Sequence, residues 1–173
     1  MTEVKTLATV WLDGCSGCHM SLLDLDERLI ELSSQFTLVY SPLVDRKTFP
    51  EHVDVTLVEG AVASEDDLRK IRKIREHTRV LVSLGDCALT GNVSAMRNTY
   101  GPEPVLLRVY PNLEKAPTEG VPKLLDRVRP VHEVVPVDVF VPGCPPAAET
   151  IYQVLAELLA GHVPNLEGVA HFG

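Results

Sequence analysis

Apolar residues follow two alternating patterns along this chain. Nearly continuous apolar runs, rich in valine and leucine, occupy residues 4–12, 36–40, 53–58, 79–84 and 137–141. Between them, segments 19–33, 88–97 and 145–160 place apolar residues three or four positions apart, as does the segment after Ser64. Continuous runs are typical of strands buried on both faces, and the wider spacing is typical of amphipathic helices.

Local signals support the helix that follows Ser64 and the last helix. Ser64 is a favourable N-cap, and the three acidic residues at 65–67 suit the positive end of a helix dipole. Gly161 follows the last apolar segment, where a helix C-cap is expected. Between residues 100 and 130, six prolines predict a long irregular connection.

The alternation of strands and helices predicts an α/β fold over a single domain, residues 1–173. We expect a flavodoxin-like, doubly wound parallel sheet with helices on both faces. In such sheets ligands bind beyond the carboxyl ends of the strands, so this edge is where a site is expected.

The composition limits the classes of function that this chain can have. Of 173 residues 45% are hydrophobic, which supports a packed core, and the net charge of −8 argues against nucleic acid as a partner. The sequence contains no apolar run long enough to span a membrane, and its start does not resemble a signal peptide. We therefore expect a cytoplasmic protein, in which thiols stay reduced.

The four cysteines carry the clearest chemistry. Cys15 and Cys18 form a CSGC pair after the first predicted strand, Cys87 follows the fourth, and Cys144 follows the fifth. The carboxyl ends of parallel strands share one edge, so all four thiols are expected together there. Four cysteine thiolates are the ligand set of an iron–sulfur cluster.

Two other interpretations of the cysteines remain open at this point. A redox dithiol would use the CSGC pair alone and would leave Cys87 and Cys144 unexplained. A structural zinc would use all four, but zinc sites usually combine two local pairs, whereas here one pair joins two distant single cysteines.

Six further residues are candidates for contacts with the ligands or with a partner. Four glycines flank the cysteines and permit close approach of the backbone to sulfur: Gly14, Gly17, Gly85 and Gly143. Glu59 follows the third strand, and its alternatives are a surface carboxylate or a role at an interface or in proton transfer. His19 follows Cys18 and is either a hydrogen-bond donor near the cofactor or a partly exposed residue at a helix start.

The segments LDGCSGCHMSL, VEGAV, GDCALTGNV and VPGCPP together resemble the small subunit of [NiFe]-hydrogenases. In altered form they also resemble the related 20-kilodalton subunit of respiratory complex I, in which two adjacent cysteines would stand at the first site. The CSGC spacing favours hydrogenase. Because the chain has no cysteine beyond these four, it is most similar to the small subunit of soluble, NAD-reducing hydrogenases.

The resemblance implies an electron-transfer subunit of an oxidoreductase complex, with no catalytic residue on this chain. Cys15, Cys18, Cys87 and Cys144 would ligate one proximal [4Fe–4S] cluster. Its partners would be a large subunit that holds the NiFe centre and diaphorase subunits with further iron–sulfur clusters and a flavin. Met20 stands where many hydrogenase small subunits have a glutamate, so a proton-relay role for that position does not carry over.

Three alternatives to these assignments remain. The flavodoxin-like fold raises FMN as a cofactor, but the loop that would hold its phosphate is LDGCSGC, so FMN is not favoured. The chain could instead serve another ferredoxin- or quinone-linked redox complex. From a different class, it could be a zinc-stabilised adaptor protein.

Overall fold

The computed structural model describes residues 4–173, which are built around a five-stranded parallel sheet. Its strands are β1 (Lys5–Trp11), β2 (Phe36–Tyr40), β3 (Val53–Glu59), β5 (Thr78–Leu84) and β7 (Val139–Val141). They lie in the order β2-β1-β3-β5-β7. Counted within this sheet alone, that order is 2-1-3-4-5, the flavodoxin-like arrangement. The predicted fold class is confirmed.

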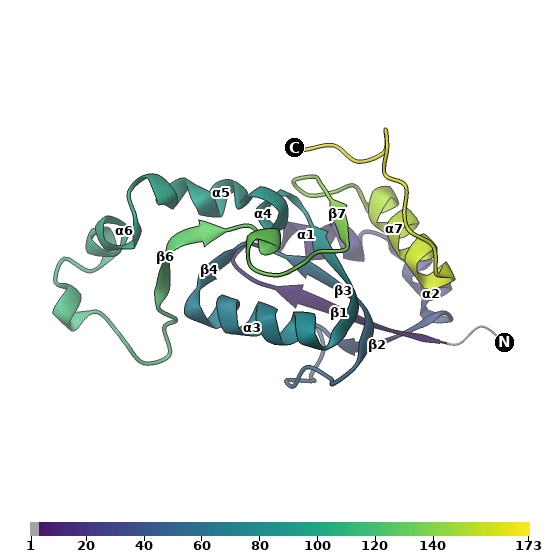
Figure 1. The fold of residues 1–173 in the computed structure, drawn as a ribbon, viewed down its shortest axis with the longest axis horizontal. Coiled ribbons are helices and arrows are strands. Elements are labelled where there is room, and N and C mark those ends of the chain that lie inside the picture. The colour runs from purple at the N-terminus through teal and green to yellow at the C-terminus, as the bar shows by residue number, and fades with distance from the viewer. Residues whose placement is uncertain (1–3) are drawn as a thin grey trace.

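Helices cover both faces of the sheet (Figure 1). On one face are α1 (Gly17–Leu23), α2 (Glu27–Ser33) and α7 (Ala148–Ala160), and on the other are α3 (Glu65–Glu76) and α4 (Asp86–Thr90). Alternate strand residues fill the two cores. Leu57 packs with the first set of helices and Val58 with the second, and both are almost completely buried. Burial on both faces explains why the strands are continuously apolar.

Two of the predicted helices are divided. Segment 19–33 forms α1 and α2, separated by a turn in which Asp26 has a φ of 49°. Segment 88–97 is divided at Gly91, whose φ is 83°, into α4, α5 (Asn92–Ala95) and the 3₁₀ helix η1 (Met96–Thr99). The last helix begins at Ala148, after two prolines, rather than at residue 145.

The prediction for residues 100–130 is partly wrong, because this region contains regular structure. It forms α6 (Pro102–Val109), the 3₁₀ helix η2 (Leu113–Lys115) and β6 (Leu124–Arg129). Strand β6 pairs antiparallel with β4 (Val62–Ser64), and neither strand was expected. A further 3₁₀ helix, η3 (Val131–Glu133), leads towards β7. In Figure 1 this region forms an arm beside the main sheet, with α6 at its outer end.

The capping predictions are confirmed. Ser64 accepts a hydrogen bond from the Asp67 backbone, and the Asp67 side chain accepts one from the Ser64 backbone, which completes a capping box at α3. Gly161 ends α7 with a φ of 87°.

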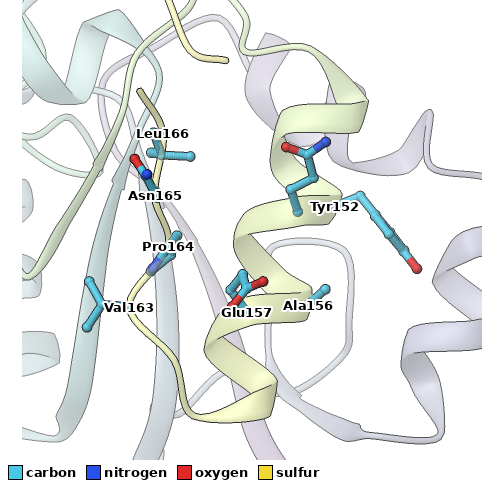
Figure 2. Close-up of a pocket in the computed structure, with 8 residues that line it drawn as sticks. Tyr152, Ala156, Glu157, Val163, Pro164, Asn165 and Leu166 are labelled. Atoms are coloured by element: carbon cyan, nitrogen blue, oxygen red, sulfur yellow. The ribbon is translucent and has the colours of Figure 1, made fainter. Parts of the chain in front are cut away.

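The chain after α7 runs back along that helix, and between them lies a groove (Figure 2). Tyr152 and Glu157 line its helix side, and Pro164 and Leu166 its other side. The groove contains none of the four cysteines. Among residues 4–173, no helix has both the length and the apolar character needed to cross a membrane.

Candidate metal centre

The four cysteines meet at one cavity on the carboxyl edge of the sheet. Cys15 lies in the loop after β1 and Cys18 in the first turn of α1. Cys87 lies in the first turn of α4, after β5, and Cys144 lies between β7 and α7. All four line a cavity of about 60 Å³, together with Gly17, Asp86, Gly143 and Pro145. The convergence that strand order predicts is therefore present. None of the four is in a disulfide.

Gly85 and Gly17 allow the backbone to approach the sulfurs. Gly85 has a φ of 80°, and a Cβ atom at this position would overlap the Sγ of Cys18. A Cβ atom on Gly17 would lie 3.3 Å from the Sγ of Cys15, closer than ordinary van der Waals contact. At these two positions the cavity wall is backbone because a side chain would occupy the space of a thiol.

Gly14 and Gly143 shape the loops instead. A Cβ atom on Gly14 would lie 3.1 Å from the Cα of Gly60, where the loop after β1 crosses the turn after β3. Gly143 has a φ of 136°, and a side chain there would collide with the backbone of Pro146. Neither glycine has a sulfur among the nearest neighbours of that added atom.

Glu59 is buried, so the surface alternative for this carboxylate is wrong. Its exposed fraction is 2%. Its Oε2 accepts a hydrogen bond of 2.7 Å from the backbone N–H of His19 and lies 3.0 Å from the Nδ1 of the same residue. The carboxylate therefore holds the first turn of α1, which carries Cys18.

His19 is buried too, with an exposed fraction of 5%, which excludes the partly exposed alternative. Its Nε2 lies 2.9 Å from the Oγ1 of Thr9, and that hydroxyl is 2.8 Å from the Oγ of Ser41. Thr9 and Ser41 are also buried. Hydrogen bonds at the backbone N–H and the Nε2 of His19 thus connect α1 to Glu59 at the end of β3 and to Thr9 in β1.

Burial makes the inner thiols difficult to ionise in the absence of a cation. Desolvation raises the pKa of Cys18 far above its usual value, and the charge of Glu59 and the other three thiols raise it further. Desolvation also raises the pKa of Cys87, as do Cys144 and Cys15, while a hydrogen bond from Asn92 opposes the shift. A bound metal reverses this balance, because its positive charge stabilises coordinating thiolates.

Sequence reasoning missed Asp86 as a site residue. Its carboxylate is 5% exposed and accepts hydrogen bonds from the backbone N–H groups of Gly143, at 2.7 Å, and Gly173, at 2.9 Å. Its own N–H donates to the Gly143 carbonyl at 2.9 Å. Asp86 therefore ties the Cys87 turn to the Cys144 loop. The available signal was a carboxylate adjacent to Cys87 at the end of a buried strand.

The family of the chain follows from a match over residues 15–158 to the model described as NADH ubiquinone oxidoreductase, 20 Kd subunit. The chain belongs to this family. The match begins at Cys15 and extends beyond Cys144, so it includes all four cysteines.

Curated relatives include hydrogenase subunits. The delta subunit of the NAD-reducing hydrogenase HoxS of Cupriavidus necator is 40% identical over 164 residues, which cover 90% of this chain and 78% of the relative. One subunit of the F420-non-reducing hydrogenase vhu of Methanocaldococcus jannaschii is 39% identical over 172 residues, or 96% of this chain. The chain spans only 60% of the length of that relative.

A chain in a solved hydrogenase structure is also similar to this chain. One chain in the crystal structure of an NAD+-reducing [NiFe]-hydrogenase in the H2-reduced state is 37% identical, with a TM-score of 0.91. The alignment covers 99% of this chain and 100% of that one. The predicted resemblance to the small subunit of NAD-reducing hydrogenases is confirmed.

Proposed function

We propose that this chain is the electron-transfer small subunit of a cytoplasmic NAD-reducing [NiFe]-hydrogenase. The observation that carries the proposal is the convergence of Cys15, Cys18, Cys87 and Cys144 on one cavity at the carboxyl edge of the strands. The likeness to the delta subunit of HoxS and to the solved NAD+-reducing enzyme supports the choice of complex.

The residues at the cavity fit one [4Fe–4S] cluster, held by the four cysteines. When bound, the cluster supplies one-electron transfer. A structural zinc usually combines two local cysteine pairs. Here one local pair, Cys15 and Cys18, joins two distant single cysteines, which favours the cluster over the zinc-stabilised adaptor.

The other residues of the site act on the ligands. Gly85 and Gly17 provide room for the sulfurs, Glu59 holds the turn that carries Cys18, and Asp86 holds the loop that carries Cys144. No acid, base or nucleophile on this chain is required, because the hydrogen-splitting site belongs to the partner. FMN on this chain is not favoured, since the loop after β1 is used by Cys15 and Cys18.

Exposed apolar side chains near the cysteines support a permanent partner. Met20, Val93 and Met96 are 56%, 66% and 69% exposed, and Trp11 is 42% exposed. Met20 follows Cys18 by two residues, and Val93 lies in the segment after the Cys87 helix. We assign this surface to the large subunit that carries the NiFe centre and the arm of residues 100–130 to a further contact with that subunit or with the diaphorase.

A second candidate is a hydrogenase that passes its electrons to an acceptor other than NAD. The 39% identity to a subunit of an F420-non-reducing hydrogenase favours it. The cysteine site and its chemistry are the same in both candidates, and only the partner subunits differ. Activity assays with NAD and with ferredoxin as acceptors distinguish the two.

Substitution of one proposed ligand tests the function. We expect Cys144→Ser, in the purified complex, to lose this chain's iron together with H2-dependent NAD reduction, because a cluster with three thiolates is labile. The control is Val163→Ser, whose site is 85% exposed and outside the cavity. Full activity and full iron content in Cys144→Ser would refute the ligand assignment.

A further inference from the structure

Asn92 occupies an unusual backbone position beside the cysteine cavity. Its φ is 38°, in the left-handed region, and it follows Gly91, whose φ is 83°. Asparagine is one of the few residues other than glycine that adopt this conformation readily. The resulting turn between α4 and α5 directs the Asn92 side chain to Cys144, which lies in a different loop, between β7 and α7.

The side-chain amide of Asn92 donates to a proposed ligand. Its Nδ2 lies 3.4 Å from the Sγ of Cys144. A side-chain amide carries only donor hydrogens on nitrogen, so the thiolate is the acceptor.

The surrounding turn fixes the position of this donor. The backbone N–H of Asn92 donates to the Oγ1 of Thr90 at 3.2 Å, and the N–H of Gly91 donates to the Cys87 carbonyl at 2.9 Å. A side chain on Gly91 would collide with Ala95. The amide is thus part of the turn that follows the Cys87 helix, and it contacts Cys144, the proposed ligand in the loop after β7.

We propose that Asn92 raises the reduction potential of the bound cluster by hydrogen bonding to the Cys144 thiolate. This inference rests on the proposed function. Reduction adds one negative charge, which the cluster shares with its sulfur ligands, so a donor to sulfur stabilises the reduced form more than the oxidised form. Asn92 is a positioning residue in this sense, because it acts on the metal group through a ligand.

The test is a redox titration of the intact complex, followed by electron paramagnetic resonance. The signal of this chain's cluster is identified as the one that Cys144→Ser removes. We expect Asn92→Ala to keep the cluster and to shift its midpoint potential to a more negative value. Asn92→Asp, which replaces the donor with a carboxylate in a conformation that Asp also tolerates, is expected to shift it further in the same direction.

Asn98 provides a matched control. Its side chain makes two hydrogen bonds to the backbone of Val128, at 2.7 and 2.9 Å, and none to sulfur. We expect Asn98→Ala to lower thermal stability and to leave the potential unchanged. A purely structural role for Asn92 would instead make the two alanine variants behave alike.

Isotope labelling gives a second, independent readout. With ¹⁵N-asparagine, the reduced cluster is expected to show a weak nitrogen hyperfine coupling that Asn92→Ala abolishes and Asn98→Ala retains. An unchanged potential in both Asn92 variants, or no asparagine coupling in the wild type, would overturn the inference. If the Cys144→Ser complex showed every cluster signal of the wild type, that result would instead overturn the proposed function.

Discussion

Gly85 makes the cavity wide enough for the Cys18 thiol, and this can be tested with one methyl group. We expect Gly85→Ala to reduce the iron content of the chain severely, because the added Cβ atom would overlap the Cys18 sulfur and because φ is 80°. Gly101→Ala is the matched control, since it has a φ of 78° and no atom within 4 Å of its added Cβ. Both variants carry the backbone strain, so equal iron loss in the two would show that the sulfur contact is irrelevant. Metal analysis of the purified complexes makes the comparison.

Asp54 makes the stability of the sheet depend on pH. Burial alone would raise the pKa of its carboxyl group, but two hydrogen bonds from Thr6 and the charges of Arg79 and Lys5 outweigh burial and lower the pKa below its usual value. A carboxyl group whose pKa is lower in the folded state stabilises that state at pH values above its pKa in the unfolded state. This stabilisation is lost as the pH falls through the pKa of the folded state.

The expected result for Asp54→Asn is a loss of about 1 kcal/mol in the free energy of unfolding at pH 7, because a charged acceptor becomes neutral. The difference from wild type should shrink as the pH falls below about 4, the usual pKa of an aspartate. Urea unfolding of the chain from pH 7 to pH 3 measures it, and a difference that is constant over this range would contradict the assignment.

The sequence was sufficient to predict that the four cysteines meet at one edge of the sheet, but not that the residues next to them are buried. Each cysteine follows a strand that its apolar run reveals, so its place at the sheet edge follows from topology alone. The buried Glu59 carboxylate accepts a hydrogen bond from the backbone N–H of His19 across the gap between β3 and α1. No local pattern reports such a pairing, since the two residues are distant in the sequence.

At the scale of elements, helix boundaries were least predictable where periodicity continues through a break. Leu25 lies in the turn between α1 and α2, yet it packs in the same core as Leu22 and Leu32, so the apolar spacing gives no sign of the interruption. Strands β4 and β6 were missed for a different reason. Each is stabilised by pairing with the other, and that contact joins residues 62–64 to residues 124–129.

Asp86 joins two elements, and its removal should loosen the site. We expect Asp86→Ala to leave the N–H of Gly143 without its acceptor, at a cost of about 1–3 kcal/mol, and to release the Cys144 loop. The measurement is the rate of iron loss from the complex to a chelator, which should increase.

Asp66→Ala serves as the control for this variant. Its side chain is 56% exposed and pairs with Arg69 on the surface of α3. We expect no change in the rate of iron loss from it. An Asp86→Ala complex that loses iron at the wild-type rate would mean that the Cys144 loop is held by other contacts.

At the scale of the whole molecule, the alternation of strands and helices predicted the sheet and the edge where the cysteines meet. The sequence constrains the order of the strands in the sheet less strongly, because several doubly wound strand orders are compatible with the same alternation of strands and helices. The observed order places β1 beside the central strand β3, with Cys15 and Cys18 directly after β1. The cavity thus lies in the crevice at which doubly wound sheets bind their ligands.

The most direct test of the account is the iron and acid-labile sulfide content assigned to this chain in the anaerobically purified native complex. It is obtained as the difference between wild type and Cys144→Ser. We expect a loss of about four iron and four sulfide per chain, the content of one [4Fe–4S] cluster, with a nickel-containing partner in the same sample. Stoichiometric zinc without sulfide would contradict it, because the four cysteines would then be structural ligands and the chain would carry no electrons.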